Sequence, residues 1–287
     1  MSQATLPETT TLLLRRDGWR LHVTLNRPEA RNAMSFAMVR ELMAVFAAIA
    51  HDRTIRAVIL RGSGGTFCSG GDIKDMAAAR GAEPGPDGKD PLAASNRLFG
   101  RMLEQIEAAP QAVIAVIEGS ALGGGFGLCC VSDVAIAADD ARFRLPETSL
   151  GVPPAQIAPF IVRRLGLTHA RRLAVTGGSL DAAQALALGL IHYISHISHV
   201  SHVSHVSPGT GLDDQLARVL QDIGRCAPAA VATTKRLVLA AAGAHGDTLS
   251  QLLDAASDDF AAAARGDESV EGMTAFLQKR SPQWAEA

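Results

Sequence analysis

The sequence predicts an α/β fold with a largely parallel sheet, followed by a purely helical region. Short apolar strand-like runs alternate with stretches of helical periodicity over the first two thirds of the 287 residues. Such β-α-β units form right-handed crossovers between parallel strands. Beyond about residue 211, apolar residues recur only at helical spacing. We therefore expect a core of residues 1–210 and a C-terminal helical subdomain of residues 211–287.

In chain order, the core begins with a hairpin at residues 11–25 that turns at Asp17-Gly18. Apolar residues at three- and four-residue spacing then predict a helix with Ser35 as its N-cap. The strands expected after the hairpin are 57–61, 113–117 and 134–137. The helices expected are 35–51, one from residue 72, 92–108, one ending at 131, one starting at Pro153-Pro154, and then 212–225, 229–242, 248–265 and 270–279.

Two glycine-rich turns stand out, Gly70-Gly71-Asp72 and Gly123-Gly124-Gly125. Each follows a strand-like run and precedes a helical stretch. Glycine has no Cβ to keep a ligand away from the backbone N–H groups of such a turn. Two turns of this kind that meet in space would offer two N–H donors to one developing negative oxygen. The pattern thus indicates an oxyanion hole built from backbone alone.

Three common functions of glycine-rich loops do not fit this sequence. Residues 65–70 have the outer spacing of a phosphate-binding P-loop, but Gly71-Asp72 stands where Lys-Ser/Thr is required. No G-x-G-x-x-G opens a helix after a first strand, and neither a G-x-S-x-G nucleophile elbow nor an H-E-x-x-H motif occurs. These absences argue against an NTPase, a nicotinamide-dependent dehydrogenase and a serine hydrolase.

Charge and composition narrow the range of partners and compartments. A formal net charge of −2 gives no reason to expect nucleic acid or an anionic membrane as a partner. The four cysteines form no C-x-x-C pair, which favours buried thiols in a reducing cytoplasm. The N-terminus has no secretory pattern, and no apolar run reaches transmembrane length. We expect a cytoplasmic protein.

Four motifs in register resemble one family. They are Leu25-Asn26-Arg27-Pro28, the run from Phe67 to Lys74, Ala121-Leu122-Gly123-Gly124-Gly125, and Leu145-Pro146-Glu147. Their order and spacing are similar to the enoyl-CoA hydratase/isomerase (crotonase) superfamily, and the resemblance covers about residues 12–280. It implies a crotonase-like ββα spiral with a C-terminal helical trimerisation subdomain. It also implies an acyl-CoA thioester as substrate, no separate cofactor or metal, and a homotrimer or a hexamer built as a dimer of trimers.

The resemblance also implies roles for individual residues. The oxyanion donors map onto the N–H groups of Gly71 and Gly124, and the catalytic acid–base group maps onto Glu147. Burial beside Pro146 and apolar neighbours would raise the pKa of that carboxyl. The positions that match contacts to CoA are Arg27, Arg31, Asp72, Ile73 and Lys74, and those that match residues reaching into a neighbouring subunit's site are Phe276 and Lys279.

Two departures from the family pattern bear on the reaction. Gly127 stands where the best-known hydratases carry a second glutamate, so either Glu147 handles both proton transfers or another group orients the water. The segment 153–160, together with Gly127, is similar to hydratases of branched glutaconyl-CoA esters in leucine and acyclic-terpene catabolism. There Gln156 could orient water or a substrate carboxylate, and Arg163 or Arg164 could pair with that carboxylate.

We therefore expect an enoyl-CoA hydratase that uses Glu147, Gly71 and Gly124. A Δ3,Δ2-enoyl-CoA isomerase with a single glutamate and a non-catalytic acyl-CoA-binding protein remain the alternatives.

One segment fits none of these functions, a Ser-His-Ile/Val repeat at residues 195–206. Its composition indicates a solvent-facing low-complexity insertion. Histidine-rich tracts can bind transition metals, but we expect no functional metal site here.

Overall fold

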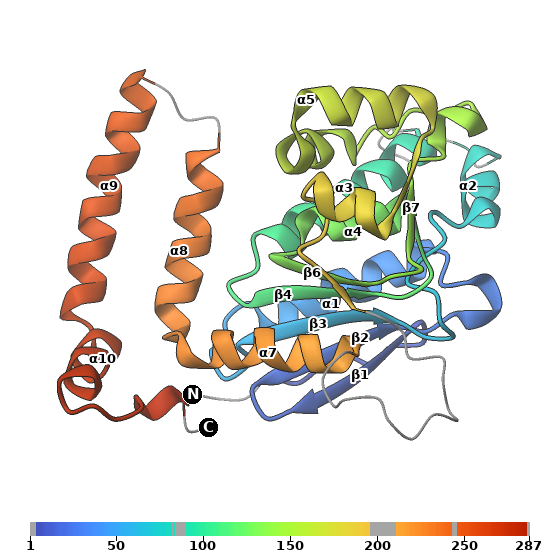
Figure 1. Cartoon of the computed structure of the whole chain (residues 1–287). Helices are drawn as coiled ribbons and strands as arrows, with labels where there is room; N and C mark the ends of the chain where they lie inside the picture. The colour runs from blue at the N-terminus through green and yellow to red at the C-terminus, as the bar shows by residue number, and fades with distance from the viewer. Residues whose placement is uncertain (1–3, 82, 84–89, 196–210, 243–245, 286–287) are drawn as a thin grey trace.

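The computed structural model describes residues 4–81, 83, 90–195, 211–242 and 246–285. Figure 1 shows a sheet with helices on both faces and a group of C-terminal helices to one side. The main sheet has six strands in the order β1-β2-β3-β4-β6-β9. They are β1 (Leu12–Asp17), β2 (Arg20–Leu25), β3 (Ala57–Gly62), β4 (Ala112–Ile117), β6 (Val134–Ala138) and β9 (Tyr193–Ser195).

The strand pairing matches the sequence prediction for this sheet. β1 and β2 form an antiparallel hairpin in which Leu12 lies opposite Leu25. Every later pair in the sheet is parallel, from β2–β3 to β6–β9. The α/β class with a largely parallel sheet is thus confirmed. β9 was not predicted, because a three-residue strand is too short to show a periodic pattern.

A second, smaller sheet positions the two chain segments that follow it. It consists of β5 (Ser120–Leu122), β7 (Arg142–Arg144) and β8 (Ser179–Asp181), in the order β5-β7-β8. β5 and β7 are parallel neighbours, while β7 and β8 are antiparallel. Sequence patterns indicated none of these strands. They matter because β5 leads directly into Gly123 and β7 leads, through Leu145-Pro146, into Glu147.

The predicted helices appear in the expected order, one of them with a displaced start, and the short α6 was not predicted. Their bounds are η1 (Pro28–Ala30), α1 (Phe36–Ile49), α2 (Ile73–Arg80), α3 (Pro91–Glu107), α4 (Gly124–Val131), η2 (Glu147–Leu150), α5 (Ala158–Thr176), α6 (Ala182–Ala187), α7 (Leu212–Arg225), α8 (Pro228–Ala241), α9 (Gly246–Arg265), α10 (Asp267–Leu277) and η3 (Gln283–Ala285). The prediction that a helix starts at Pro153-Pro154 was wrong. Residues 153–157 form turns, in which Ile157 N donates to Pro154 O at 3.1 Å, and α5 begins after them.

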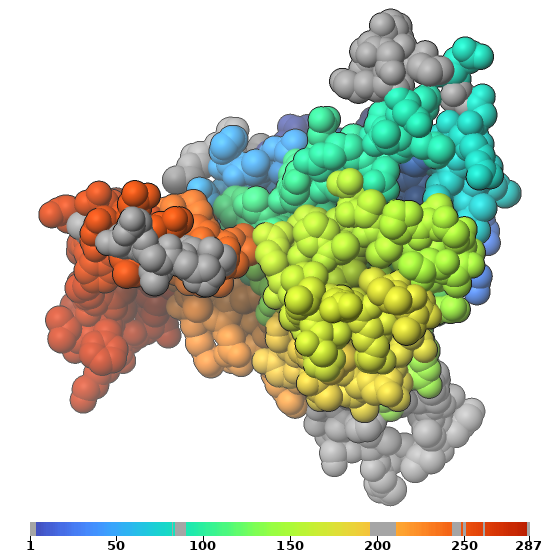
Figure 2. All heavy atoms as spheres, turned by 90° about the horizontal axis from the view of Figure 1, so that it is seen from above, coloured from blue at the N-terminus to red at the C-terminus, as the bar shows by residue number. Residues whose placement is uncertain are grey.

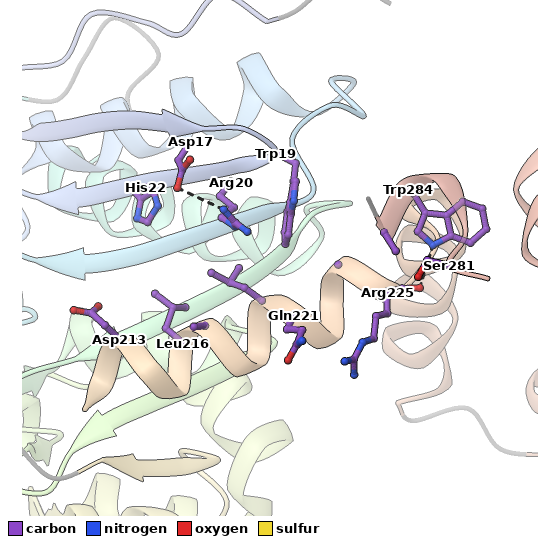
Figure 3. A pocket seen from close by; sticks show the side chains of 14 residues that line it. Asp17, Trp19, Arg20, His22, Asp213, Leu216, Gln221, Arg225, Ser281 and Trp284 are labelled. Atoms are coloured by element: carbon purple, nitrogen blue, oxygen red, sulfur yellow. Dashed lines mark hydrogen bonds and ion pairs between the residues drawn. The ribbon is translucent and has the colours of Figure 1, made fainter. Parts of the chain in front are cut away.

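The two faces of the main sheet bury different clusters. Alternation along β2 sends Leu21, Val23 and Leu25 into the larger apolar core, under α1, α3 and α4. The opposite face, with Ile59 of β3 and Ile114 of β4, is covered by the apolar stripe of α7. Arg20 and His22 of β2 point to this second face, toward α7 (Figure 3).

The C-terminal helices divide into one that belongs to the core and three that stand beside it. α7 buries Leu212, Leu216, Val219 and Leu220 against the sheet. By contrast, α8, α9 and α10 project from the side of the core, as a separate lobe in the view from above (Figures 1 and 2). The boundary that we placed at residue 210 therefore follows helical content, whereas the packing changes after α7.

The projecting helices carry large apolar side chains in solvent. The exposed ones among the described residues of α8–α10 include Val238, Leu253, Phe260, Val270, Met273, Phe276 and Leu277.

Residues 196–206 of the Ser-His repeat lie outside the described part of the chain. Within the described residues, no helix combines the length and the apolar character needed to cross a membrane.

Candidate active site

The first glycine turn is held in place by a buried asparagine. Asn32 donates from its amide to Ser63 O at 2.8 Å and Thr66 O at 2.6 Å, and accepts from Arg27 N at 2.8 Å. These bonds tie the loop after β3 to the segment before α1. The chain then pairs with β5 through Cys68 and with Met34 through Gly71. Gly70 between them has a φ of +103°, which favours glycine.

The second turn begins the buried helix α4. Gly123 has a φ of +48°, and its N–H donates to Arg144 O at 3.0 Å. Gly125 is needed for packing, since a Cβ there would stand 2.8 Å from the Cβ of Cys68 in the first turn. Burial raises the pKa of the Cys68 thiol to about 11, so this cysteine serves as packing and remains protonated.

The two turns meet, and Glu147 lies where they meet. A Cβ added to Gly123 would stand 3.5 Å from Gly70 Cα and 2.8 Å from Glu147 Oε1. Gly71 and Gly124, the two predicted oxyanion donors, are the next residues along the chain from this contact. The structure thus brings together three segments that are widely separated in the sequence.

The N–H groups of Gly71 and Gly124 are without a protein acceptor in the described part of the chain. Beside Gly71, Met34 N donates to Gly70 O and Asp72 N donates to Met34 O, and these two bonds leave the Gly71 N–H unused. Gly124 is the first residue of α4, where the backbone N–H has no acceptor within the helix. Free backbone donors favour a negatively charged oxygen, and at Gly124 the helix start adds to this preference.

Glu147 is placed at the start of η2, directly after Pro146. Its Oε2 is shielded from solvent and has no hydrogen-bond partner among the described residues. Burial raises the pKa of this carboxyl above its ordinary value of 4.5, opposed only by the hydrogen bond from its own N–H. The short helix is anchored to α5, because Thr148 Oγ1 donates to Ala174 O at 3.0 Å. A carboxyl with a raised pKa holds a proton more readily than an ordinary glutamate, which suits a group that accepts and returns protons.

The surroundings of α4 are apolar where a second carboxylate would stand. A Cβ at Gly127 would lie 3.3 Å from Leu103 Cδ1 and 3.5 Å from Ile157 Cγ1. Next to Gly124, the corresponding neighbours are Phe99 Cε2 at 3.4 Å and the thioether of Met34 at 3.5 Å. Sequence patterns gave no sign of Met34 and Phe99. Only the folded structure reveals their place at the site, because each reaches Gly124 from a separate part of the chain.

Gln156 lies beside this apolar wall, over a glycine of α3. The place of a Cβ at Gly100 is occupied by Gln156 Oε1, at 2.0 Å, with Arg97 Nη1 at 2.9 Å. The two arginines that we considered as partners of a substrate carboxylate are engaged elsewhere. Arg163 pairs with Glu107 at 2.8 Å, and Arg164 donates to the carbonyl oxygens of Leu190 and Ser132.

The predicted CoA-binding residues fall into two groups. Arg27 and Asp72 form an ion pair of 2.8 Å, and Arg27 also donates to Ala33 O. Burial alone would raise the pKa of Asp72, but the Arg27 bond and the N–H groups of Lys74 and Asp75 hold it below its ordinary value. These two residues therefore shape the loop.

The remaining predicted CoA-binding residues of this region are open to solvent. Arg31 and Lys74 are exposed cations at the same end of α2, and Ile73 is 69% exposed between them in the chain. The single chain does not bring the C-terminal pair to Glu147. Phe276 is 82% exposed near the end of α10, which lies in the projecting lobe, and Lys279 follows it (Figure 1).

Metal-binding side chains do not gather at this site. Among the described residues, no group of three or more His, Cys, Asp or Glu side chains could hold an ion. A cleft of about 600 Å³ exists on the other face of the main sheet, below the β1–β2 hairpin, and contains none of the predicted site residues. Of the predicted catalytic groups, the Glu147 carboxyl and the N–H groups of Gly71 and Gly124 lie together at the glycine turns.

Comparison with known proteins places these motifs in a wider group. The family model described as enoyl-CoA hydratase/isomerase matches residues 21–287. The crystal structure of an enoyl-CoA hydratase/isomerase from Marinobacter aquaeolei superposes with a TM-score of 0.88 and 49% identity, over 96% of this chain and 99% of that one. Pseudomonas aeruginosa AtuE gives a TM-score of 0.87 and 52% identity, over 96% and 100%. The 2,3-dehydroadipyl-CoA hydratase of Escherichia coli is 30% identical over 265 residues, which are 92% of this chain and 94% of that protein.

Proposed function

Because the chain belongs to the enoyl-CoA hydratase/isomerase family, we propose that it hydrates branched, glutaconyl-type 2-enoyl-CoA esters. The relatives' names mark it as an enzyme of the hydro-lyase type that acts on CoA thioesters. Within that class, the proposal names isohexenylglutaconyl-CoA, or a related methylglutaconyl-CoA, as the substrate. The free cysteines, three of them buried, favour the cytoplasm as its location.

One observation carries the catalytic assignment, the meeting of both glycine turns at the Glu147 carboxyl. The thioester carbonyl oxygen sits between the N–H groups of Gly71 and Gly124. Charge grows on that oxygen when the β-carbon is attacked, and two fixed donors stabilise it. A single donor of this kind is worth about 2.7–4 kcal/mol in the transition state.

Glu147 moves the protons of the reaction. Its carboxylate takes a proton from water while the water oxygen bonds to the β-carbon, and the electron pair of the double bond moves to form the enolate. The neutral carboxyl then returns a proton to the α-carbon, and the carbonyl is restored. The raised pKa of Glu147 suits the second step in particular, since burial makes the neutral carboxyl easier to form than in an ordinary glutamate.

A single carboxyl serves both steps, because the space at Gly127 is filled by Leu103 and Ile157. Among the polar side chains nearby, Gln156 is the one we assign to orient the water or a polar group of the acyl chain. Gly100 makes room for it, since any side chain there would meet Gln156 Oε1. Neither Arg163 nor Arg164 is kept in this role, because both have other partners.

The CoA portion lies along the mouth formed by the loop before α1 and the start of α2. Arg31 and Lys74 are exposed there to meet its phosphates, and Ile73 offers an apolar surface to the pantetheine. Arg27 and Asp72 hold this mouth in shape through their ion pair. CoA is part of the substrate, and we assign no separate cofactor.

We further propose that the site is completed by a second copy of the chain, in a homotrimer or a dimer of trimers. The exposed apolar side chains of α8–α10 form a surface that burial between subunits would stabilise. Phe276 and Lys279, which lie far from the Glu147 of their own chain, then reach the site of a neighbour. Sedimentation of the purified enzyme tests the assembly, and a stable monomer at micromolar concentration would contradict it.

A second candidate reaction is favoured by the same single carboxyl. A Δ3,Δ2-enoyl-CoA isomerase needs one group to carry a proton from one carbon to another, and Glu147 with its apolar surroundings suits that task. Turnover in H₂¹⁸O separates the two reactions. Hydration incorporates the heavy oxygen into the product, whereas isomerisation leaves the product unlabelled.

Substrate choice is tested with a set of enoyl-CoA esters. We expect the highest kcat/KM for 3-methylglutaconyl-CoA or isohexenylglutaconyl-CoA and a lower value for the straight-chain crotonyl-CoA. A preference for crotonyl-CoA would remove the branched-ester assignment and leave the hydratase assignment intact. Tight binding of every ester without turnover of any would instead support a non-catalytic acyl-CoA-binding protein.

A further inference from the structure

A second cleft lies on the face of the main sheet opposite the glycine turns. It has a volume of about 600 Å³, within the range of small-molecule sites. Figure 3 shows its walls: the β1–β2 hairpin with Asp17, Arg20 and His22, the helix α7, and the end of the chain with Trp284. The cleft is therefore formed where the core, the last core helix and the C-terminal segment come together.

The wall on the hairpin side presents two buried nitrogen atoms that lack hydrogen-bond partners. Arg20 Nε and His22 Nε2 are both shielded from solvent and have no hydrogen-bond partner among the described residues. Both side chains line the cleft. A buried polar group without a partner costs free energy, and an acceptor oxygen that entered the cleft would relieve that cost.

The charges around the cleft favour an anion. Asp17 is shared by Arg15 at 4.0 Å and Arg20 at 3.6 Å, and Asp213 is paired with Arg61. In these ion pairs, the three arginines Arg15, Arg20 and Arg61 share two carboxylates, which leaves one positive charge in excess.

Arg56 adds a further positive charge beside the cleft, with its guanidinium 4.8 Å from the ring of Trp19. Its guanidinium donates to backbone carbonyl oxygens alone within the described residues, including Gly224 O at 3.0 Å and Trp284 O at 2.7 Å. Burial first and then the charge of Arg15 lower the pKa of His22, which favours the neutral ring.

The rest of the lining is apolar. Leu216, Ala217 and Leu220 of α7 form one side, and Trp19 lies at the hairpin end with guanidinium groups over its ring, Arg20 at 4.6 Å and Arg56 at 4.8 Å. A bare inorganic anion would leave most of this volume unfilled. The ligand that fits both halves has one anionic group and an apolar body.

We propose that this cleft is a second binding site, separate from the acyl-CoA site, for a small organic anion with an apolar chain. The anionic group is a carboxylate or a phosphate ester that accepts hydrogen bonds from Arg20 and His22, and the chain lies on α7. Because one wall is the C-terminal segment that follows α10, an occupied cleft would also hold that segment to the core.

The test uses the two tryptophans as reporters, because the chain has only two and both line the cleft. The full-length enzyme is titrated with octanoate, octyl phosphate and octanol, with tryptophan fluorescence and calorimetry as readouts, in the presence and absence of saturating CoA. We expect saturable binding of octanoate or octyl phosphate that persists with CoA, and none with octanol. The two anions distinguish a carboxylate ligand from a phosphate ester.

Variants assign the binding to this cleft. Arg20→Gln should weaken binding of the preferred anion by about tenfold, the loss of one charge-assisted hydrogen bond, while Arg40→Gln, an exposed change on α1, should leave it unchanged. Arg225→Gln, in a side chain that is 65% exposed, provides a cleft variant that keeps the fold intact. The proposal is wrong if neither anion binds saturably, if octanol binds as tightly, if CoA abolishes the binding, or if Arg20→Gln and Arg225→Gln, folded, bind as the wild type does.

Discussion

The Glu147 carboxyl lies against the backbone of Gly123, so that a Cβ atom at residue 123 would stand 2.8 Å from Glu147 Oε1. This contact joins the second glycine turn to the group that we propose as acid and base. The turn itself needs a φ of +48° at Gly123, and the same missing side chain that permits this backbone also leaves space for the carboxyl. Glycine is therefore required at position 123 both for the backbone conformation of the turn and for the position of the Glu147 carboxyl.

Replacing this glycine tests the contact. Gly123→Ala should lower kcat by about 100-fold or more, because a methyl group displaces the carboxyl from the reacting atoms. Gly189→Ala is the matched control, since Gly189 has a φ of +77° and no atom within 4 Å of a Cβ position. It carries a similar backbone strain and should leave kcat unchanged. Equal activity of the two variants, measured on one enoyl-CoA ester, would contradict the contact's role.

Removing the charge of Glu147 should abolish turnover and spare the fold. We expect Glu147→Gln to lower kcat by about 10²–10⁴-fold, the usual contribution of a general acid–base group. Its midpoint of urea unfolding should be no lower than that of the wild type, because a buried carboxylate is costly when ionised. Glu29→Gln, an exposed change, should alter neither quantity. Near wild-type kcat in Glu147→Gln would remove this residue from the mechanism.

The raised pKa of Glu147 predicts the pH dependence of the reaction. The ionised form accepts the proton from water, so kcat/KM should fall in acid with a midpoint above the ordinary carboxyl pKa of 4.5. The folded state holds this proton more tightly than the unfolded state does. The stabilisation by Glu147 is therefore present below the unfolded pKa and lost as pH rises through the folded pKa. A profile of kcat/KM with its acid midpoint at or below 4.5 would count against this.

The Arg27–Asp72 ion pair should stabilise the loop before α2. Asp72 is 10% exposed and Arg27 23%, so we expect a coupling energy of about 1.5–3 kcal/mol in a double-mutant cycle with Asp72→Asn and Arg27→Met. The pKa of Asp72 is lowered, so this stability is present above the unfolded pKa and is lost as pH falls through the folded pKa. The exposed pair Arg15–Asp17, at 4.0 Å, is the control and should show little coupling. Equal coupling in the two pairs would show that burial does not strengthen the first.

Arg56 should be a major determinant of how the chain end docks. Its guanidinium donates to Ile223 O, Gly224 O, Cys226 O and Trp284 O at 2.7–3.0 Å, which joins the end of α7 to the residues after α10. Arg56→Met leaves these carbonyl groups without a donor, so the free energy of unfolding should fall by about 3 kcal/mol. Arg40→Met, in an exposed side chain, serves as the control for chemical denaturation. A change of under about 0.5 kcal/mol in Arg56→Met would contradict the docking role.

Local patterns in the sequence determined the long elements and the chemistry-bearing segments. Period-two and helical spacing located the β1–β2 hairpin and the helices from α1 to α10, apart from the short α6, because periodicity is a property of neighbours in the chain. The glycine turns and the Leu145-Pro146-Glu147 motif were visible for the same reason, and the family that they indicated is confirmed by the comparisons. The three-residue strands stayed hidden, since they exist only through pairing with distant partners.

Tertiary structure alone decided which of these segments meet. The family resemblance implied that Glu147 shares a site with the glycine turns, but no local pattern showed its contact with Gly123. Nor did any pattern show that Leu103 and Ile157 close the space at Gly127, or that Arg163 and Arg164 have partners away from the site. The tertiary structure also separates α7, which packs on the sheet, from α8–α10, although all four helices share the same periodicity in the sequence (Figure 1). The physical reason is that packing depends on which surfaces fit together across hundreds of residues, whereas a sequence pattern reports only the preferences of each segment.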